Sequence, residues 1–278
     1  AKSDFPRRFL KTEDRLENWA AIEPYFEQLR ERPLGTPSEL ERWLLDYSEL
    51  CAAVGEVGTD RHVRMTCQTD DPARKAAFVD FIENIDPQFK VRCHELDERY
   101  AKAPAASQLP RERYFVLDRA IRAGVELFRQ ENVPLQTEEA RLEQQYQEVS
   151  GAQTVVFDGK ERTLQQLAPY AERTDRTIRQ AAWEADANRR LEDKNRLDDI
   201  FDQLVGFRDR IARNANCADF REYSFRAKLR FDYTPKDCLA FHDAIERTAV
   251  PAMRELQRER KASLGLEVLR PWDMSVDI

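Results

Sequence analysis

Hydrophobic residues recur every three or four positions along most of the chain, which is the period of an amphipathic helix. The first strong element opens at residues 36–39, Thr-Pro-Ser-Glu, which combine a capping threonine, a proline at the first helical position and a capping-box glutamate. We expect the helix that follows to end at Gly55 and Gly58. Its hydrophobic positions share one stripe and are Leu40, Trp43, Leu44, Tyr47, Leu50, Cys51 and Val54.

Further helices are predicted downstream. They follow one another closely in the sequence, and we expect them to pack antiparallel in a hairpin or bundle. Asp71 and Asp86 each precede a proline, as helix-capping residues do. The proline-bearing segment 102–110 is the best candidate for a linker in the first half. Beyond it, residues 115–130 form one amphipathic run. Thr137 is predicted to cap another helix that stops near residue 151.

One segment carries a clear β signal, because residues 154–163 place an Asp-Gly pair between two short β-prone arms. Such a pair accepts the positive φ angles that a two-residue hairpin turn requires, so we expect a small β-hairpin. Thr163 then opens a short helix through a second capping box. Asp175 lies in the first turn of a longer helix, whose inward positions are predicted to be Ile178, Ala182 and Trp183.

The last hundred residues continue the helical pattern. Residues 184–214 alternate in charge around spaced hydrophobic positions, which predicts one long surface helix. Residues 234–237, Thr-Pro-Lys-Asp, repeat the proline-bearing cap. A stripe follows through Pro251, where we expect a kink or a restart. The stripe consists of Phe241, Ile245, Met253 and Leu256.

Composition restricts the class of protein. With 278 residues, 41% hydrophobic and 35% charged, the chain has enough apolar material for a core. The net charge of −7 leaves no basic surplus to neutralise phosphates, so nucleic acid is not an expected partner. No segment approaches the roughly 18 consecutive apolar residues of a membrane helix, and charges interrupt residues 1–30 where a signal peptide has its apolar core. We therefore expect no membrane association and a cytoplasmic location.

Residues with catalytic or metal-binding potential are sparse. The histidines are His62, His94 and His242, and no H-E-x-x-H, glycine-rich phosphate loop or nucleophile elbow is present. His94 and Glu98 would share a helix face and could hold a hard metal, but a histidine amid acids is more typical of a solvent-facing position. The carboxylates Asp198, Asp199 and Asp202 are expected to be surface charge. The expected core anchors are Trp19, Trp43, Trp183 and Trp272.

The five cysteines are scattered and include no C-x-x-C pair, which suits neither a disulfide framework nor a thiolate zinc site. We expect them to be reduced and mostly buried. They are Cys51, Cys67, Cys93, Cys217 and Cys238.

Three stretches together resemble the oligoendopeptidase F branch of the M3 zinc metallopeptidases. The first is 217–235, from Cys-Ala-Asp-Phe to Asp-Tyr-Thr-Pro, with Phe-His-Asp-Ala-Ile-Glu at 241–246. The second is 264–273, Leu-Gly-Leu-Glu-Val-Leu-Arg-Pro-Trp-Asp. The third is 157–164, continued by Asp-Arg-Thr-Ile-Arg at 175–179. The resemblance covers about residues 110–278 well and the first hundred more loosely.

The resemblance implies a two-lobed, mainly α peptidase whose deep channel admits short peptides and excludes folded proteins. In that family, H-E-x-x-H and a later glutamate supply the Zn²⁺ ligands and the general base. This motif lies downstream of the Arg-Pro-Trp-Asp segment and is absent from this sequence, so no catalytic, cofactor-binding or metal-binding residue can be assigned in this chain. We expect Zn²⁺ in the complete enzyme and none bound by this chain.

The resemblance also suggests a domain organisation. Residues 1–110 are expected to form an N-terminal helical hairpin or bundle region, and 111–205 the rest of a multi-helix lobe with the small hairpin. Residues 206–278 would be the truncated start of a helical zincin-type catalytic domain. Isolated, this last region is expected to expose apolar faces, which would make the chain sticky or dependent on a partner.

Three interpretations remain open from the sequence. The favoured one is the N-terminal portion of a zinc-dependent oligopeptidase, inactive alone, with short peptides as substrates and with the missing catalytic half as partner in cis or in trans. The alternatives are a half-enzyme or remnant that binds peptides or a partner without catalysis, and an unrelated helical scaffold.

Overall fold

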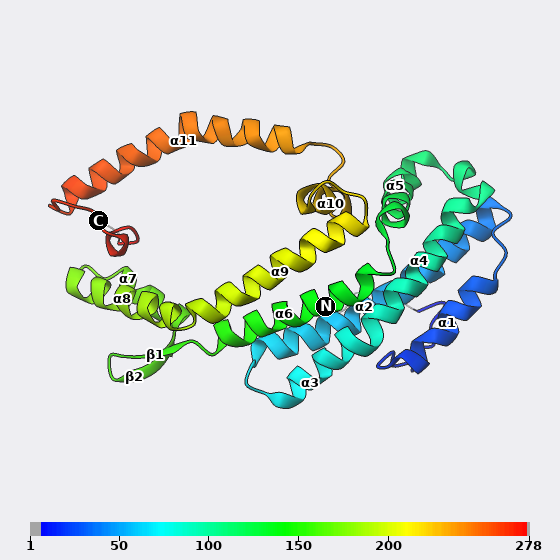
Figure 1. Cartoon of the computed structure of the whole chain (residues 1–278), viewed down its shortest axis with the longest axis horizontal. Helices are drawn as coiled ribbons and strands as arrows, with labels where there is room; N and C mark the ends of the chain where they lie inside the picture. Colours follow the sequence, from blue (N-terminus) through cyan, green and yellow to red (C-terminus); the bar gives the residue numbers. More distant parts are fainter. Residues whose placement is uncertain (1–6, 277–278) are drawn as a thin grey trace. The chain divides into compact units, whose positions relative to one another are not determined.

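Helices make up most of the chain, as the sequence predicts. The structure is a computed structural model that describes residues 7–276 (Figure 1). Residues 1–6 and 277–278, at the outer limits of the predicted regions 1–110 and 206–278, lie outside the described residues. The first elements are α1 (Trp19–Glu31), α2 (Pro37–Cys67), α3 (Pro72–Asp80), η1 (Phe81–Ile85), α4 (Asp86–Lys102), η2 (Pro104–Gln108), α5 (Arg111–Leu127) and α6 (Asn132–Gly151).

The elements of the second half include the two strands found in the described residues. These elements are β1 (Thr154–Phe157), β2 (Lys160–Thr163), η3 (Leu164–Leu167), α7 (Ala168–Ala171), α8 (Arg176–Glu192), α9 (Lys194–Asn214), α10 (Phe220–Ala227), α11 (Pro235–Ser263) and η4 (Pro271–Asp273). The mainly α fold class with one small hairpin is therefore confirmed. Within residues 7–276, no helix combines the length and the apolar character needed to cross a bilayer.

Contacts divide the chain into two compact units. One unit comprises residues 1–148 with 200–229, and the other comprises 149–199 with 230–278. The sequence-based boundaries at residues 110 and 205 concern the domains of a complete enzyme and stay predictions.

The main hydrophobic core lies in the first unit, where α1, α2, α4 and α5 pack their apolar stripes together. Trp43 is almost fully buried there, and its indole Nε1 donates a hydrogen bond to the Leu29 carbonyl at 2.9 Å. The capping box predicted at the start of α2 is present, with Glu39 N–H donating to Thr36 Oγ1 and Thr36 N–H donating to the Glu39 carboxylate.

Helix α2 is longer than predicted, because neither glycine ends it. It continues to Cys67, with Gly55 exposed and Gly58 buried inside it. A Cβ atom at position 58 would lie 2.5 Å from Cζ of Phe81, so glycine here permits the Phe81 ring to pack against the helix. The glycine that looked like a stop signal is a packing site.

The helix start at Asp71-Pro72 is confirmed, whereas Asp86-Pro87 makes no side-chain capping bond and lies in helical backbone that continues from the preceding turn. The side chain of Asp71 accepts from two backbone N–H groups at the start of α3. A π-helical turn, η1, then leads directly into α4 at Asp86. The predicted linker 102–110 does connect α4 to α5, but it forms the 3₁₀ turn η2 and buries Ala105 and Ala106 in the main core.

Helix α6 begins earlier than predicted. It starts at Asn132, so Thr137 is internal rather than a cap, and its hydroxyl donates to the Val133 carbonyl. Asn132 is buried and anchors this end of α6: its Nδ2 donates to the Ile211 carbonyl at 3.0 Å. The sequence signal was misread because a threonine inside a helix can bond back to the preceding turn instead of capping.

The β-hairpin lies where it was predicted. Strands β1 and β2 pair antiparallel, with Thr154 opposite Thr163 and Phe157 opposite Lys160. Asp158 and Gly159 both have positive φ, at 53° and 69°, as a tight two-residue turn requires. The capping box from Thr163 to Gln166 also forms, and it opens the 3₁₀ turn η3.

The charged run 184–214 is two helices, not one. Helix α8 ends at Glu192 and α9 begins at Lys194, with the non-helical Asp193 between them. Arg189 Nη1 and Gln153 Nε2 both donate to the carboxylate of this Asp193. Side-chain bonds to a residue at a helix end favour a break that the charge pattern alone does not mark.

Helix α8 presents a different inward face from the one predicted. Ala182 is buried as expected, but Ile178 and Trp183 are 38% and 41% exposed. The side chain that is buried instead is Arg179, at 1% exposure. A hydrophobicity pattern cannot identify this position, because its burial depends on a distant acidic partner.

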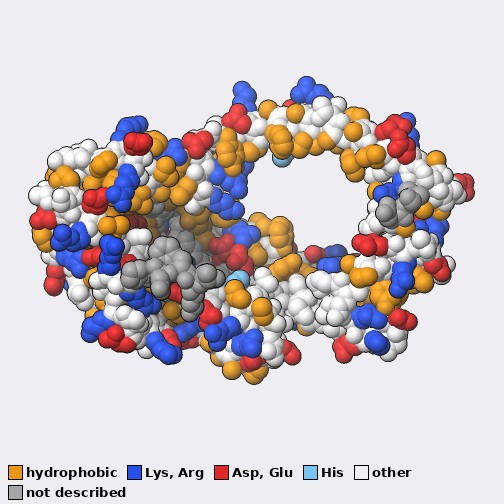
Figure 2. Space-filling model, turned by 180° about the vertical axis from the view of Figure 1, so that it is seen from behind, with side chains coloured by type: hydrophobic (Ala, Val, Ile, Leu, Met, Phe, Trp, Pro, Cys, Tyr) orange, Lys and Arg blue, Asp and Glu red, His pale blue; other side chains and the backbone are white. Residues whose placement is uncertain are grey.

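Helix α11 runs through Pro251 without restarting, and Figure 1 shows its ribbon bending along its length. None of its residues is buried. The predicted apolar stripe is present and uncovered, and Figure 2 shows hydrophobic side chains gathered along this helix. This exposure agrees with the expectation that the C-terminal region presents apolar faces.

Candidate functional site

The histidines singled out in the sequence lie on different elements. His62 is exposed on α2 beside the Phe78 ring, and His242 is exposed on α11. His94 lies on α4. Residues 7–276 contain no group of three or more His, Cys, Asp or Glu side chains placed to hold a metal ion. The residues present therefore do not fit a zinc site.

His94 is half-buried rather than solvent-facing. Its ring stacks on Phe128 with a centroid distance of 3.9 Å and an interplanar angle of 13°. Its Nε2 is 3.7 Å from Oε1 of Glu98, while the other carboxylate oxygen of Glu98 accepts from Lys102 at 2.8 Å. Burial lowers the pKa of His94, which favours the neutral ring. The His94–Glu98 pair is therefore an interaction on the helix surface, in which Lys102 also binds the glutamate.

A cavity of about 320 Å³ lies beside His94, with its walls supplied by α4, α5, α6 and α10. Cys93 and Asp97 line it from one turn of α4 to the next. The hydroxyl of Tyr47, on α2, donates to Oδ1 of Asp97 at 3.1 Å, and burial raises the pKa of Asp97 to about 6. The lining of this cavity therefore combines a thiol with a carboxyl group whose pKa is raised to about 6.

Sequence reasoning missed Asp97 because it looked like one of many helical acids. The available signal was its spacing: Asp97 follows Cys93 by four residues, on the face of the predicted helix that points toward the core.

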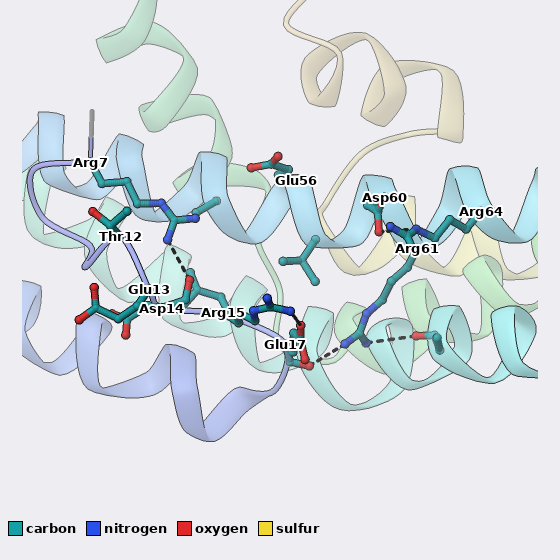
Figure 3. A pocket seen from close by; sticks show the side chains of 14 residues that line it. Arg7, Thr12, Glu13, Asp14, Arg15, Glu17, Glu56, Asp60, Arg61 and Arg64 are labelled. Atoms are coloured by element: carbon teal, nitrogen blue, oxygen red, sulfur yellow. Dashed lines mark hydrogen bonds and ion pairs between the residues drawn. The ribbon is translucent and has the colours of Figure 1, made fainter. Parts of the chain in front are cut away.

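A larger pocket, of about 920 Å³, lies between α2 and the segment that precedes α1 (Figure 3). Its arginines are engaged by neighbouring groups. Arg7 Nη1 donates to the Asp14 carbonyl at 2.8 Å, and Arg61 bonds the Glu17 carbonyl and the Asp80 carboxylate. Since these cations already have partners, the pocket offers a polar surface rather than a preformed anion site.

The other candidates occupy the surface or the core. Asp198, Asp199 and Asp202 are exposed on α9, as expected of surface charge. Among the tryptophans, only Trp43 is fully buried. Trp19 is half-buried and stacks on Phe26, and the partly exposed Trp183 lies 5.4 Å from the ring of Trp272. The expectation of four core anchors was therefore wrong for Trp183.

The strongest buried charge cluster joins α8 to η4. Asp273 is fully buried, and its two oxygens accept from Nε and Nη2 of Arg176, at 3.0 and 2.9 Å. Arg179 Nη2 donates to the same carboxylate at 3.0 Å, and Arg179 Nε donates to the Trp272 carbonyl, also at 3.0 Å. The hydrogen bonds from Arg176 lower the pKa of Asp273 to about 2. Burial acts in the opposite direction, and the Arg270 N–H and Arg179 lower the pKa further. These groups leave the carboxylate no free position for a ligand, so the cluster fastens η4 to α8.

The comparisons with known proteins bear on the second half of the chain and on the fold. The model of peptidase family M3 matches residues 169–276, which include the Arg176, Arg179 and Asp273 cluster. A search of curated proteins gives no match.

Several solved structures share the fold. A protein from Bacillus anthracis assigned as an oligoendopeptidase F superposes with a TM-score of 0.87 over 99% of this chain, at 23% identity. PZ peptidase A, solved with an inhibitor, gives a TM-score of 0.85 over 92% of this chain, at 24% identity. An oligoendopeptidase F from Enterococcus faecium gives 0.69 over 93% of this chain, at 14% identity.

The resemblance to the M3 peptidases is thereby confirmed, by the family model for residues 169–276 and by the fold for nearly the whole chain. At these identities the structural likeness establishes the fold alone. The chain spans about half the length of the structures it matches, since it covers 49%, 45% and 54% of them.

Proposed function

We propose that this chain is the N-terminal portion of a zinc-dependent oligopeptidase of the oligoendopeptidase F type, which hydrolyses short peptides in a deep channel. The observation that carries the proposal is the match of residues 169–276 to peptidase family M3. The fold, shared over 99% of the chain with about half of a longer peptidase, supports it.

In this proposal the chain contributes a structural part of the enzyme and none of the catalytic residues. The described residues hold no set of three metal-ligating side chains. We therefore propose that the chain alone is inactive, and that Zn²⁺ and the general base belong to a catalytic half provided in cis or in trans. Residues 206–278 would begin the zincin-type catalytic domain.

The proposed enzyme is cytoplasmic and acts on peptides, with no nucleic acid or membrane partner. Five cysteines without a paired spacing are typical of a reducing compartment. The net charge of −7 is unfavourable for binding phosphate backbones.

The proposal is tested on the native polypeptide recovered with an antibody against this chain. We expect an intact mass about twice the 32.6 kDa of this chain, and cleavage of short internally quenched peptides that a zinc chelator abolishes. The 278-residue chain alone, as the control, should release no product. Chelator-resistant cleavage by the native polypeptide, or no cleavage by a polypeptide that contains an intact H-E-x-x-H, would refute the proposal.

A second function, a non-catalytic module that binds a peptide or a partner, is favoured by the uncovered face of α11. Phe241, Met253 and Leu256 on this face are 64%, 52% and 56% exposed. Exposed apolar stripes of this kind mark interaction surfaces. Titration of the isolated chain with unfolded peptides distinguishes this function, because a chain that shows no binding is no such peptide-binding module.

A further inference from the structure

The cavity beside α4 lies entirely within the first compact unit. Its walls come from α4, α5, α6 and α10 and from the connection between α5 and α6, all within residues 1–148 and 200–229. Its volume of about 320 Å³ is at the lower end of the range of small-molecule sites, and an engineered cavity of about 150 Å³ already holds benzene. The space therefore suits a ligand the size of one substituted ring.

Asp97 brings a negative charge to this lining without a counter-ion. The hydroxyl of Tyr47 donates to Oδ1 of Asp97 at 3.1 Å. Tyr47 does not line the cavity, so it holds the carboxyl group from the α2 side, while Asp97 itself borders the space. Within residues 7–276, Asp97 forms no ion pair, and burial raises its pKa to about 6 against the effect of the Tyr47 hydrogen bond. At about pH 7.5 the carboxylate is therefore ionised but uncompensated.

The basic side chains of the lining are engaged by other groups. Lys90 Nζ forms an ion pair with Asp86 at 2.6 Å. Arg129 Nη1 donates to two backbone carbonyl oxygens, at 3.0 and 2.6 Å. Burial lowers the pKa of His94, which favours its neutral form. The cavity therefore presents Asp97 to a ligand without a protein cation bound to it.

The rest of the lining is largely apolar and aromatic. These side chains are Phe89, Leu127, Phe128, Tyr223 and Ala227. Aromatic faces attract cations, so they suit a positively charged ligand as well as its apolar body. Gly124 on α5 also lines the cavity, and a Cβ atom at this position would meet nothing within 4 Å. The space over this turn of α5 is thus open.

We propose that this cavity binds a small primary amine with an apolar body, whose ammonium group is the counter-ion of Asp97. The ammonium group donates a charge-assisted hydrogen bond to the carboxylate, and the apolar body packs on the aromatic side chains. A buried charge is unfavourable unless it is paired, so the ligand supplies what the protein leaves out. A neutral ligand of the same shape gains the apolar contacts alone.

The test compares phenethylamine with phenethyl alcohol, which share one shape and differ in charge. Each is titrated into the 278-residue chain at about pH 7.5 and followed by ligand-observed NMR. We expect the amine to bind about ten- to a hundredfold more tightly than the alcohol, as a hydrogen bond to a charged group implies. This site is separate from peptide hydrolysis, so its test needs no peptidase activity and its failure would leave the proposed function untouched.

Two pairs of variants assign the binding to this cavity. Asp97→Asn should bind the amine as weakly as the alcohol, whereas the control Asp198→Asn, which removes an exposed carboxylate on α9, should behave as the wild type. Gly124→Leu places a side chain in the cavity and should abolish the binding of both ligands. Its control is Gly55→Leu, at an equally open position on α2 that does not line the cavity, and this variant should bind both ligands normally.

Several results would overturn the inference. On the wild-type chain these are no binding of the amine, or equal affinities for the amine and the alcohol. On the variants they are a preference for the amine that persists in Asp97→Asn, or amine binding that survives Gly124→Leu. The comparison of the two ligands on the wild-type chain is decisive by itself, so the inference stays testable where a variant fails to fold.

Discussion

Replacing Asp273 by asparagine tests whether the buried ion cluster holds η4 against α8. Asp273 is fully buried, and so is one of its two arginine partners, Arg179, which is 1% exposed. The substitution keeps the volume of the side chain and one acceptor oxygen. It removes the negative charge, and it leaves the Arg179 guanidinium buried without a counter-ion.

The expected cost follows from two physical arguments. Leaving one member of a buried ion pair uncompensated costs about 3–5 kcal/mol. Independently, lowering the pKa of Asp273 from 3.8 to about 2 corresponds to roughly 2 kcal/mol of stability from its charged form. This contribution is complete above about pH 4 and is lost as the pH falls toward 2. We therefore expect asparagine to lower the free energy of unfolding by about 2–4 kcal/mol at pH 7.

Urea unfolding at pH 7, followed by circular dichroism and by tryptophan fluorescence, measures this cost. The fluorescence reports the local change, because Trp272 precedes Asp273 and lies 5.4 Å from Trp183. The matched control is Glu255→Gln, since Glu255 forms an exposed ion pair with Arg258 that is worth at most about 1 kcal/mol. An Asp273→Asn chain whose unfolding free energy equals that of the control would refute the assignment of the cluster as the fastening of η4.

Three further predictions concern single positions. Gly58→Ala should lower the melting temperature through overpacking of about 1–3 kcal/mol, whereas Gly55→Ala, with open space around its Cβ, should not; equal effects would contradict the packing role. Asp97→Asn should stabilise the chain by about 1–3 kcal/mol above pH 6 and not below pH 4, because a pKa near 6 in the folded state makes the ionised carboxylate unfavourable there. Urea unfolding of the variant and the wild type over this pH range measures the effect, and a difference in midpoint that does not change with pH would contradict it. Leu256→Lys should leave the unfolding free energy within about 0.5 kcal/mol and weaken self-association in sedimentation velocity; unchanged association would show that this face is not adhesive.

Much of the local structure could be predicted because its causes lie within four residues. The capping boxes at Thr36 and Thr234 form as expected, since a side chain that bonds a backbone N–H three residues away needs no tertiary partner. The Asp-Gly turn at 158–159 forms for the same reason, because its positive φ angles are a property of the two residues themselves. The resemblance of the second half to the M3 peptidases likewise rests on short stretches of sequence and on their order along the chain.

The predictions that were wrong concern residues that can play either of two structural roles. Thr137 looked like a cap but bonds back within α6, and Gly58 looked like a stop but admits an aromatic ring. The charged run around Asp193 looked like one helix, although side-chain bonds to that residue accompany a break. In each case the deciding neighbour is set by packing or by a competing hydrogen bond, which a hydrophobic pattern does not contain.

The sequence by itself determined the helical class, the hairpin, the helix caps and the absence of an H-E-x-x-H motif, because each is written in adjacent residues. Only the tertiary structure decided that Arg179 is buried, because its partner Asp273 is 94 residues away. It also decided that the Tyr47 hydroxyl donates to Asp97 and that burial raises the pKa of this carboxyl group to about 6. Burial and electrostatic pairing act through space, so side chains that look alike in the sequence acquire different chemistry once the helices pack.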